Sequence, residues 1–157
     1  MDSVFWIIEG SLCGRPGPAA APWDLEKIKE SGIKTIISID SDGVDSDMIK
    51  SLGFDHLSLN LPDSIPPLDD DRRQWLELLP DVLDYMENKL SKNGKVLIHC
   101  WAGKDRTGLL ACSYLVIKKG LTPDLAIEKV RENRPVALSS EGYETFFRKL
   151  IEEMQLK

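Results

Sequence analysis

Short apolar runs alternate with helix-forming segments along almost the whole chain, and this alternation constrains the fold more than any other feature. The strand-like runs are rich in β-branched or large apolar residues and end at Gly, Asp or Pro. They cover 4–10, 34–40, 55–61 and 95–100. Strands that alternate with helices predict an α/β fold, with a central, mostly parallel sheet of four to five strands and helices on both faces.

The segments between these runs have helical patterns. Over 69–90, apolar residues recur at steps of three and four residues and form one stripe. Pro80 interrupts this stripe and is expected to kink the helix or to split it in two. Further helices are expected at 23–31, 45–52 and 140–155.

Two helices are expected in succession after the last strand-like run. The first begins near Thr107 and ends at Gly120, because glycine readily adopts the left-handed conformation of a C-cap. Leu110, Tyr114 and Ile117 share one face of this helix. The second begins with Thr122 as its N-cap and Pro123 at its first position.

The length and the charge of the chain exclude several classes of protein. A chain of 157 residues fits one domain, 1–157, and its net charge of −6 argues against broad nucleic-acid binding. No apolar run approaches the ~20 residues that cross a bilayer, so no stable membrane insertion is expected. The start MDSVFWIIEG lacks the basic residues and long apolar core of a secretory signal. We therefore expect a cytoplasmic protein, and we expect it to be a monomer.

The cysteines do not form a recognisable framework. Cys13, Cys100 and Cys112 are an odd set without a C-x-x-C pair, so neither a disulfide framework nor a zinc site is indicated. Cys112 lies in an apolar helical stretch and is interpreted as a core residue. A redox disulfide between Cys13 and Cys100 is a lesser hypothesis.

The ten residues HCWAGKDRTG, which begin at His99, directly follow the apolar stretch KVLI and include the end of the last strand-like run. Their Gly-Lys pair does not make a nucleotide-binding loop, because Asp105 stands where such a loop needs Ser or Thr and no glycine lies five residues before Gly103. What remains is Cys100 at the end of a strand and Arg106 at the start of a helix, with five residues between them. A loop of this length can turn its N–H groups inward and form an anion site with the helix N-terminus.

Such an anion site suits a reaction between a thiolate and a phosphate. Positive surroundings favour the thiolate, which is the nucleophilic form of a cysteine. Arg106 can bind two phosphate oxygens and stabilise the charge that develops during in-line displacement. Gly103 and Gly108 suit a tight loop with close backbone approach. No metal ion or other cofactor is required.

This stretch resembles the signature H-C-x5-R-[ST]-G of the cysteine-dependent protein tyrosine phosphatases, and the chain is similar to their small atypical dual-specificity branch. Further similarity lies in EGSLCGRPGP, GIKTIISI, NLPDSIPP and RENRP. The resemblance implies that Cys100 forms a cysteinyl-phosphate, that Arg106 binds the phosphoryl group and that Thr107 hydrogen-bonds the sulfur. His99 would order the loop from behind, or be only a core histidine. The backbone that would cradle the phosphate oxygens belongs to Trp101, Ala102, Gly103, Lys104, Asp105 and Arg106.

The resemblance also implies a general acid that protonates the leaving oxygen. The family carries an aspartate on a loop after the preceding strand, and Asp63 in LPDSIPP matches this position, with prolines on either side. Asp69, Asp70 and Asp71 are the alternatives. They open a helix, where acidic residues interact favourably with the helix dipole, so capping accounts for them better.

Three functions remain open: two kinds of phosphatase, which differ in substrate class, and a phosphate-binding protein. The expected substrates are phosphorylated proteins or peptides that carry phosphotyrosine, phosphoserine or phosphothreonine. Lys104 with Asp105 resembles the loop of phosphatases that act on phosphoinositides or inositol polyphosphates, which is the alternative. A phosphate-binding protein without activity is the third, and the intact Cys100 and Arg106 weigh against it. The residue that positions the hydrolytic water is unassigned, because neither Glu141 nor Tyr143 is a clear match.

Overall fold

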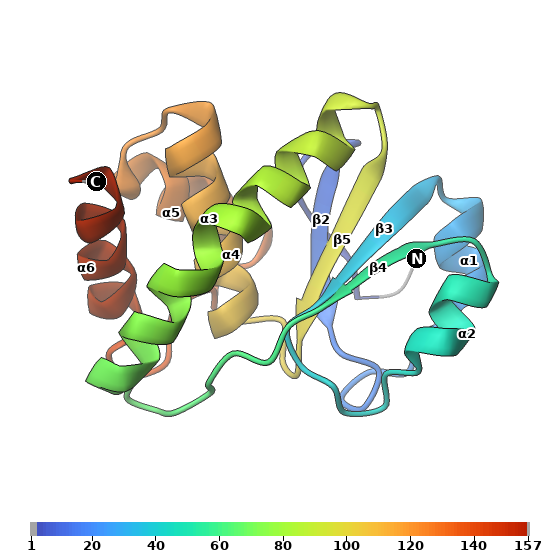
Figure 1. Cartoon of the computed structure of the whole chain (residues 1–157), viewed down its shortest axis with the longest axis horizontal. Helices are drawn as coiled ribbons and strands as arrows, with labels where there is room; N and C mark the ends of the chain where they lie inside the picture. Colours follow the sequence, from blue (N-terminus) through green and yellow to red (C-terminus); the bar gives the residue numbers. More distant parts are fainter. Residues whose placement is uncertain (1–2, 157) are drawn as a thin grey trace. The chain divides into compact units, whose positions relative to one another are not determined.

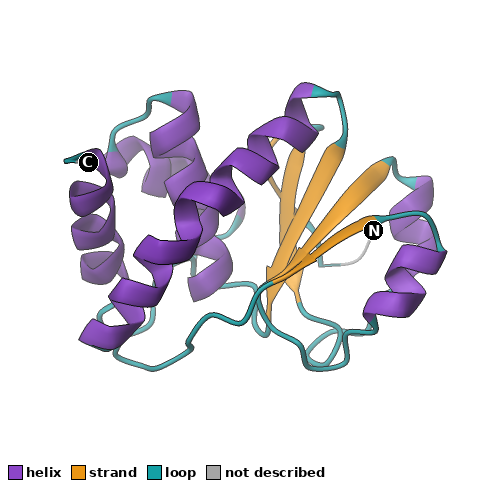
Figure 2. Cartoon of the chain, viewed as in Figure 1, coloured by secondary structure: helices purple, strands orange, loops and turns teal. Residues whose placement is uncertain are grey.

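The structure, a computed structural model, describes residues 3–156 as two compact units. The first contains the described residues up to Asn60 together with Asn88–Gly103, and the second contains Leu61–Glu87 together with the described residues from Lys104 onward. Figure 2 shows that the strands lie in the first unit, whereas the second unit is built of helices.

The strands of the first unit form one sheet in the order β1-β2-β5-β3-β4 (Figure 1). Their bounds are Phe5–Ile8 for β1, Leu12–Pro16 for β2, Ile33–Ser38 for β3, Asp55–Ser58 for β4 and Lys95–Cys100 for β5. β1 runs antiparallel to β2, and the other neighbouring pairs are parallel. The predicted α/β class with a mostly parallel sheet of four to five strands is therefore confirmed. β5 lies at the centre, so its carboxyl end is flanked by the carboxyl ends of β2 and β3, where parallel sheets bind ligands.

Two short helices pack on this sheet, as the sequence predicts. α1 (Leu25–Glu30) contacts β3, and α2 (Ser46–Ser51) contacts β4. Each helix begins at an aspartate, Asp24 or Asp45, whose side chain accepts hydrogen bonds from the first backbone N–H groups. The core of this layer consists of Cys13, Ile28, Ile33, Ile36, Ile49, Phe54 and Leu97.

The sequence does not predict β2 as a separate strand. Its residues, LCGRP, include a glycine and a proline, which are typical of turns. The strand forms because it pairs with β1 on one side and with β5 on the other, so that both edges of its backbone are hydrogen-bonded. Long-range pairing of this kind leaves no local pattern in the sequence.

α3 (Asp69–Ser91) runs through Pro80 without a break, so the predicted split is wrong. Pro80 lacks the N–H that would reach the carbonyl of Leu76, but the side chain of Pro80 faces solvent. One face of the helix is buried and is formed by Trp75, Leu79, Val82, Leu83 and Met86. The burial of this face outweighs the loss of a single hydrogen bond.

α4 (Asp105–Lys119) is the central helix of the second unit. It begins at Asp105 rather than near Thr107, and it ends at the predicted C-cap, Gly120, with φ 72°. Its residues from Arg106 to Val116 are all buried, so burial extends around the helix beyond the face that Leu110, Tyr114 and Ile117 share. α4 packs against both α5 (Pro123–Asn133) and α6 (Tyr143–Gln155), and a helix that is enclosed in this way needs apolar residues all round.

The remaining helix predictions agree with the structure. Thr122 is the N-cap of α5, and its hydroxyl accepts a hydrogen bond from the N–H of Leu125, while Pro123 is the first helical residue. α6 lies within the range predicted for the last helix. None of the helices found between residues 3 and 156 combines the length and the apolar character that a membrane crossing requires.

Candidate active site

The predicted nucleophile, Cys100, is the last residue of β5. The strand ends at this point between two neighbours, since Pro16 of β2 is in register with Cys100 and Ser38 of β3 is in register with His99. The side chain of Cys100 is buried. The residues that follow it, up to Gly103, complete the first unit.

His99 supports the backbone at Cys100. Its side chain is fully buried, and Nδ1 lies 3.1 Å from the carbonyl oxygen of Cys100, while Nε2 lies 2.6 Å from Oγ of Ser38. The ring also meets the indole of Trp23 edge-on, with 5.1 Å between the ring centroids. Burial lowers the pKa of His99 to about 4, so the imidazole is neutral at neutral pH. The His99 ring therefore contacts the backbone at the start of the signature loop.

Two glycines allow the end of β2 to approach the signature loop. Gly103 has φ +64°, and a Cβ at this position would lie 2.5 Å from the carbonyl carbon of Arg15. Gly17 donates its N–H to the carbonyl of Trp101 at 3.0 Å. Only glycine fits at Gly103, because the backbone conformation and the contact both exclude a side chain. The side chain of Trp101 itself is exposed.

Arg15 is a buried arginine that the sequence analysis misses. Only 1% of its surface is exposed, and its guanidinium donates to the carbonyls of Pro16 at 2.7 Å and Ala21 at 2.9 Å. It also lies over the ring of Trp23, 5.6 Å from the centroid. These partners hold the segment that follows β2. The sequence contains no signal for this role, because the partners are backbone carbonyls.

In the second unit, the predicted phosphate-binding arginine is tied to the segment that carries the predicted acid. Arg106 lies in the first turn of α4, is buried, and donates from Nη1 to the carbonyl of Leu61 at 3.3 Å. Asp63 follows two residues later and is exposed. The side chain that would bind phosphate and the loop that would deliver a proton therefore share a direct hydrogen bond.

The competing acidic run has the structural role that its position predicts. Oδ2 of Asp71 accepts a hydrogen bond from the N–H of Leu68 at 2.9 Å, which caps the start of α3. Asp70 is exposed and lies 3.8 Å from Arg73. The capping interpretation is confirmed at Asp71, so Asp63 remains the candidate acid in this region.

α4 begins without a side-chain cap. Lys104 occupies the N-cap position, and its side chain makes no capping hydrogen bond. Oγ1 of Thr107, which is fully buried, has no hydrogen-bond partner within residues 3–156. A buried hydroxyl without a partner lowers stability by ~1–3 kcal/mol. The Thr107 hydroxyl can therefore still form a hydrogen bond at the start of α4.

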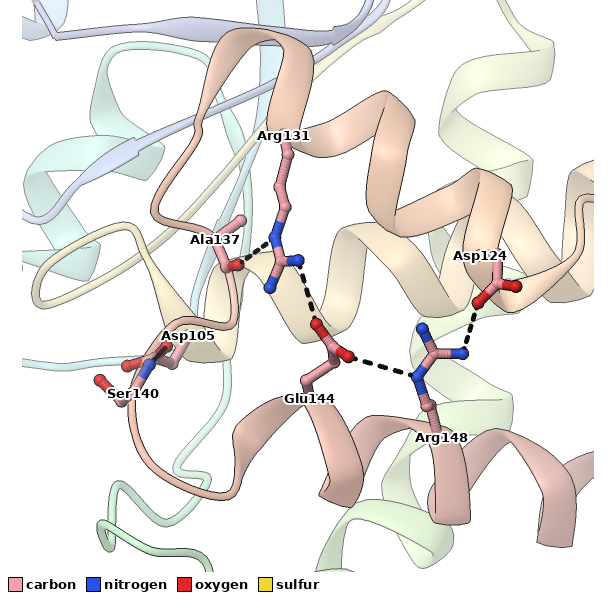
Figure 3. Close-up of polar contacts among 7 residues, drawn as sticks. All are labelled: Asp105, Asp124, Arg131, Ala137, Ser140, Glu144 and Arg148. Atoms are coloured by element: carbon pink, nitrogen blue, oxygen red, sulfur yellow. Dashed lines mark hydrogen bonds and ion pairs between the residues drawn. The ribbon is translucent and has the colours of Figure 1, made fainter.

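The side chain of Asp105 holds the connection between α5 and α6. Its Oδ1 accepts a hydrogen bond from the N–H of Ser140 at 3.2 Å (Figure 3). Its Oδ2 lies 4.0 Å from Nζ of Lys104, whose carbonyl in turn accepts from the N–H of Leu138. Gly108 lies inside α4 rather than in a loop, but the predicted close approach is real, because a Cβ there would be 3.2 Å from Cβ of Ala137.

A line of ion pairs fixes the same connection from its outer side (Figure 3). Arg131 of α5 donates to the carbonyl of Ala137 at 2.9 Å and pairs with Glu144 of α6 at 3.0 Å. Glu144 also pairs with Arg148, which reaches Asp124 at 2.6 Å. The segment 134–142 is thus anchored to α4 and α5, and α5 is in turn paired with α6. Glu141 in this segment is exposed, so no role in positioning water can be assigned to it.

The structure excludes a disulfide between Cys13 and Cys100. Cys13 is in register with Leu97, three residues before Cys100 on the neighbouring strand. At ~3.3 Å per residue, the two Cα atoms are ~10 Å or more apart, beyond the ~7 Å limit for a disulfide. Burial raises the pKa of both Cys13 and Cys112 to about 12, so both thiols are inert core groups. The core interpretation of Cys112 is confirmed.

Comparison with known proteins decides the family. The family described as "Dual specificity phosphatase, catalytic domain" matches residues 20–154. The chain belongs to this family. The family predicted from the signature is therefore confirmed, and the enzyme class is that of a dual-specificity phosphatase catalytic domain.

The dual-specificity phosphatase domain also resembles individual proteins. It is 32% identical to a "Probable protein tyrosine phosphatase type IVA B" of Dictyostelium discoideum, over 85% of this chain and 82% of that protein. It is 28% identical to "Phosphatidylglycerophosphate phosphatase PTPMT1" of Arabidopsis thaliana, over 78% of this chain and 35% of that protein. The structure "Tk-PTP in the active form" superposes with a TM-score of 0.78 and 24% identity, over 96% of this chain and 97% of that one, and supports the fold.

The matched region is a small part of several relatives. For four curated phosphatases, PTPMT1 among them, it amounts to 38% or less of their length. Within the chain, the two ends of the signature belong to different units, Cys100 to the first and Arg106 to the second. Within the first unit, His99 contacts the Cys100 carbonyl, and within the second, Arg106 bonds to the carbonyl of Leu61 in the segment that carries Asp63.

Proposed function

We propose that the chain hydrolyses phosphomonoesters of proteins, on phosphotyrosine and on phosphoserine or phosphothreonine, through a cysteinyl-phosphate and without a metal ion. One observation carries this proposal. Cys100 ends a central parallel strand, and Arg106, after the five intervening residues of the family signature, is a buried arginine in the first turn of an uncapped helix. Membership of the dual specificity phosphatase family supports it.

In the first step, the thiolate of Cys100 attacks phosphorus and forms the S–P bond while the ester P–O bond breaks. Arg106 and the N–H groups from Trp101 to Arg106 bind the three non-bridging oxygens and stabilise their charge. Asp63 gives its proton to the leaving oxygen, so the alcohol departs neutral. The hydrogen bond of Arg106 to Leu61 couples phosphate binding to the segment that carries Asp63.

In the second step, water attacks phosphorus, Asp63 accepts a proton from it, and the P–S bond breaks to release phosphate and the thiolate. The hydroxyl of Thr107 donates a hydrogen bond to the departing sulfur. The buried, unpartnered Oγ1 of Thr107 supports this role, because a satisfied hydroxyl would have to give up another bond to take it.

Phosphoinositides or inositol polyphosphates are the second candidate substrates. The observation that favours them is Lys104, a partly exposed lysine at the N-cap of α4, which adds a positive charge beside Arg106 in the sequence. The name of the PTPMT1 relative, a phosphatidylglycerophosphate phosphatase, agrees with a lipid phosphate. Protein substrates are favoured because Asp105 lies 4.0 Å from Lys104 and offsets its charge.

Within the family, we place the chain in the small atypical branch, and its segments EGSLCGRPGP, NLPDSIPP and RENRP are most like dual specificity protein phosphatase 23. The Lys104–Asp105 pair is a departure from that protein's loop. Residues 1–157 form one catalytic domain in this proposal, which acts as a cytoplasmic monomer without a nucleic-acid partner.

The test is hydrolysis of p-nitrophenyl phosphate and of phosphotyrosine and phosphoserine peptides, under reducing conditions and with excess chelator. The wild-type chain should be active, and Cys100→Ser should lose about 10³-fold or more in kcat, as when a nucleophile is removed. Rapid acid quenching should trap one phosphate on Cys100 by mass spectrometry. Asp70→Asn is the control, because Asp70 is exposed and pairs only weakly with Arg73. Turnover that survives in Cys100→Ser, or that needs added metal, contradicts the proposal.

A further inference from the structure

A line of four hydrogen bonds runs through the first unit from α2 to the backbone of Cys100. Oγ of Ser46 lies 2.8 Å from Nδ1 of His56, and Nε2 of His56 lies 2.8 Å from Oγ of Ser38. Oγ of Ser38 lies 2.6 Å from Nε2 of His99, whose Nδ1 lies 3.1 Å from the carbonyl oxygen of Cys100. These residues come from α2, β4, β3 and β5, so the line crosses the sheet.

The last member of the line determines the direction of every bond. The carbonyl oxygen of Cys100 can only accept, so the proton of the neutral His99 ring must be on Nδ1. Nε2 of His99 is then an acceptor, and the hydroxyl of Ser38 must donate to it. Oγ of Ser38 accepts in turn from Nε2–H of His56, and Nδ1 of His56 accepts from the hydroxyl of Ser46.

The sheet register explains why Ser38 meets both histidines. Ser38 is in register with His99 on one side, and Ile36, two residues earlier on the same face, is in register with His56 on the other. Ser38 is fully buried, and its hydroxyl contacts only the two histidines among the side chains of residues 3–156. With His56 as donor, the proton of Ser38 has one acceptor available, which is His99.

The opposite direction is unfavourable. If His99 carried its proton on Nε2, it would donate to Ser38, and the lone pair of Nδ1 would face the lone pairs of the Cys100 carbonyl. Removal of the His56 donor makes that arrangement accessible, because Oγ of Ser38 is then free to accept from His99. His56 therefore controls, through Ser38, which nitrogen of His99 bears the proton.

Burial, assisted by positive groups nearby, keeps both rings neutral near pH 7. Burial and Lys50 of α2 lower the pKa of His56. Burial lowers the pKa of His99 to about 4, and among the titratable groups facing it Arg15 and His56 act in the same direction, whereas Asp40 opposes them. Protonation of His56 would leave its Nε2–H bond to Ser38 in place, so the line holds in both charge states of His56.

We propose that His56, acting through Ser38, is a positioning residue of the reaction that holds the proton of His99 on Nδ1 and thereby fixes the carbonyl of Cys100 at the base of the signature loop. The inference rests on the proposed function for its effect on turnover, but the state of the His99 ring is independent of turnover. A fixed carbonyl keeps the loop that follows Cys100 in one conformation, so its loss should lower kcat rather than raise KM.

The experiment compares His56→Gln with His56→Phe. The amide nitrogen of Gln can replace Nε2–H as donor to Ser38, whereas Phe fills a similar volume without a donor. Ring ¹⁵N shifts at pH 7 should show His99 protonated on Nδ1 in the wild-type chain and in His56→Gln, and a mixture of the two forms in His56→Phe. With p-nitrophenyl phosphate, kcat should fall about tenfold in His56→Phe and less than threefold in His56→Gln, which corresponds to one hydrogen bond.

Two further variants separate positioning from a loss of folding. Ser38→Ala interrupts the same line, so His56→Phe should add little to it in the double variant. Ser46→Ala removes only the outer bond, which water can replace at the half-buried His56 ring, so it should match the wild-type chain.

Each outcome bears on one proposal. A His99 ring that stays protonated on Nδ1 in His56→Phe overturns the inference, whether or not the chain is a phosphatase. A changed ring with unchanged kcat overturns the positioning role. If the wild-type chain has no phosphatase activity, the proposed function fails, while the ring shifts still decide whether His56 directs the proton of His99.

Discussion

A methyl group on Gly17 would lie 2.5 Å from the carbonyl oxygen of Cys100 and 3.2 Å from Nδ1 of His99. The first distance is far below van der Waals contact, so the chain after β2 passes the base of the signature loop with no room for a side chain. The N–H of Gly17 also bonds to the carbonyl of Trp101 at 3.0 Å. Gly17 thus lies close against the Cys100 carbonyl and hydrogen-bonds to the next residue, Trp101.

Gly17→Ala should therefore destabilise the chain by about 2 kcal/mol, the usual effect of overpacking, and lower kcat as the Cys100 carbonyl moves. Urea unfolding and p-nitrophenyl phosphate turnover would measure the two effects. Gly10→Ala is the matched control: Gly10 has φ +76° but open space around it, so the change should cost about 1 kcal/mol through backbone strain and leave kcat unchanged. Equal stability of Gly17→Ala and the wild-type chain would contradict the steric argument.

The sequence predicts those parts of the fold that depend on local signals. The caps at Thr122 and Gly120 and the four apolar strands are encoded by residues close in the chain. β2 is not, because its conformation depends on pairing with β1 and β5. The expected split at Pro80 does not occur, because the burial of one face of α3 keeps the helix intact despite the missing N–H.

The candidate site likewise has parts that the local sequence predicts and parts that depend on the folded structure. The signature places Cys100 and Arg106 without any knowledge of the structure, because their spacing along the chain carries the chemistry. Arg15 bonds to the carbonyls of Pro16 and Ala21, which carry no side-chain signal, and Gly17 lies against the Cys100 carbonyl of a strand far away in the sequence. Contacts of this kind become visible only when the strands are paired.

The buried His99 ring should make stability depend on pH. Its pKa is about 4 in the folded chain, against ~6.5 when unfolded, so below pH 6.5 the unfolded chain binds a proton that the native chain does not. Native stability is therefore lost as the pH falls from about 6.5 toward 4, by about 2 kcal/mol between pH 8 and pH 5. Urea unfolding should show this slope in the wild-type chain and a smaller one in His99→Gln. Parallel slopes would show that His99 titrates normally.

Asp63→Asn should reveal the general acid through its dependence on the leaving group. An alkyl phosphate such as phosphoserine needs a proton on the leaving oxygen, so kcat should fall by about 10²-fold or more. p-Nitrophenyl phosphate releases a stable anion and should be affected much less. Asp70→Asn, at an exposed neighbour of Asp71 on α3, should leave both substrates unaffected. Small and equal losses on both substrates in Asp63→Asn would rule out the assignment.

The hydrogen bond between Asp105 and Ser140 should be preserved by Asn and lost with Ala. Asp105→Ala removes the acceptor for the Ser140 N–H and should cost about 1–2 kcal/mol, whereas Asp105→Asn keeps an oxygen acceptor and should cost less. Hydrogen exchange of the Ser140 amide is the direct measurement. It should be protected in the wild-type chain and in Asp105→Asn, and should exchange faster in Asp105→Ala. Unchanged protection in Asp105→Ala would mean that Arg131 and Glu144 hold the segment alone.

Lys104→Gln should distinguish the two substrate classes. Asp105 lies 4.0 Å from Nζ of Lys104 and already offsets its charge, so loss of the lysine should lower kcat/KM for a phosphotyrosine peptide by only about twofold to threefold. The same factor is expected for a soluble inositol polyphosphate, if Lys104 binds no second phosphate. Lys34→Gln, an exposed lysine in β3, controls for the change in net charge. A loss above about tenfold confined to inositol polyphosphates or phosphoinositide vesicles would mean that Lys104 grips a further phosphate, and the second candidate substrate would replace the first.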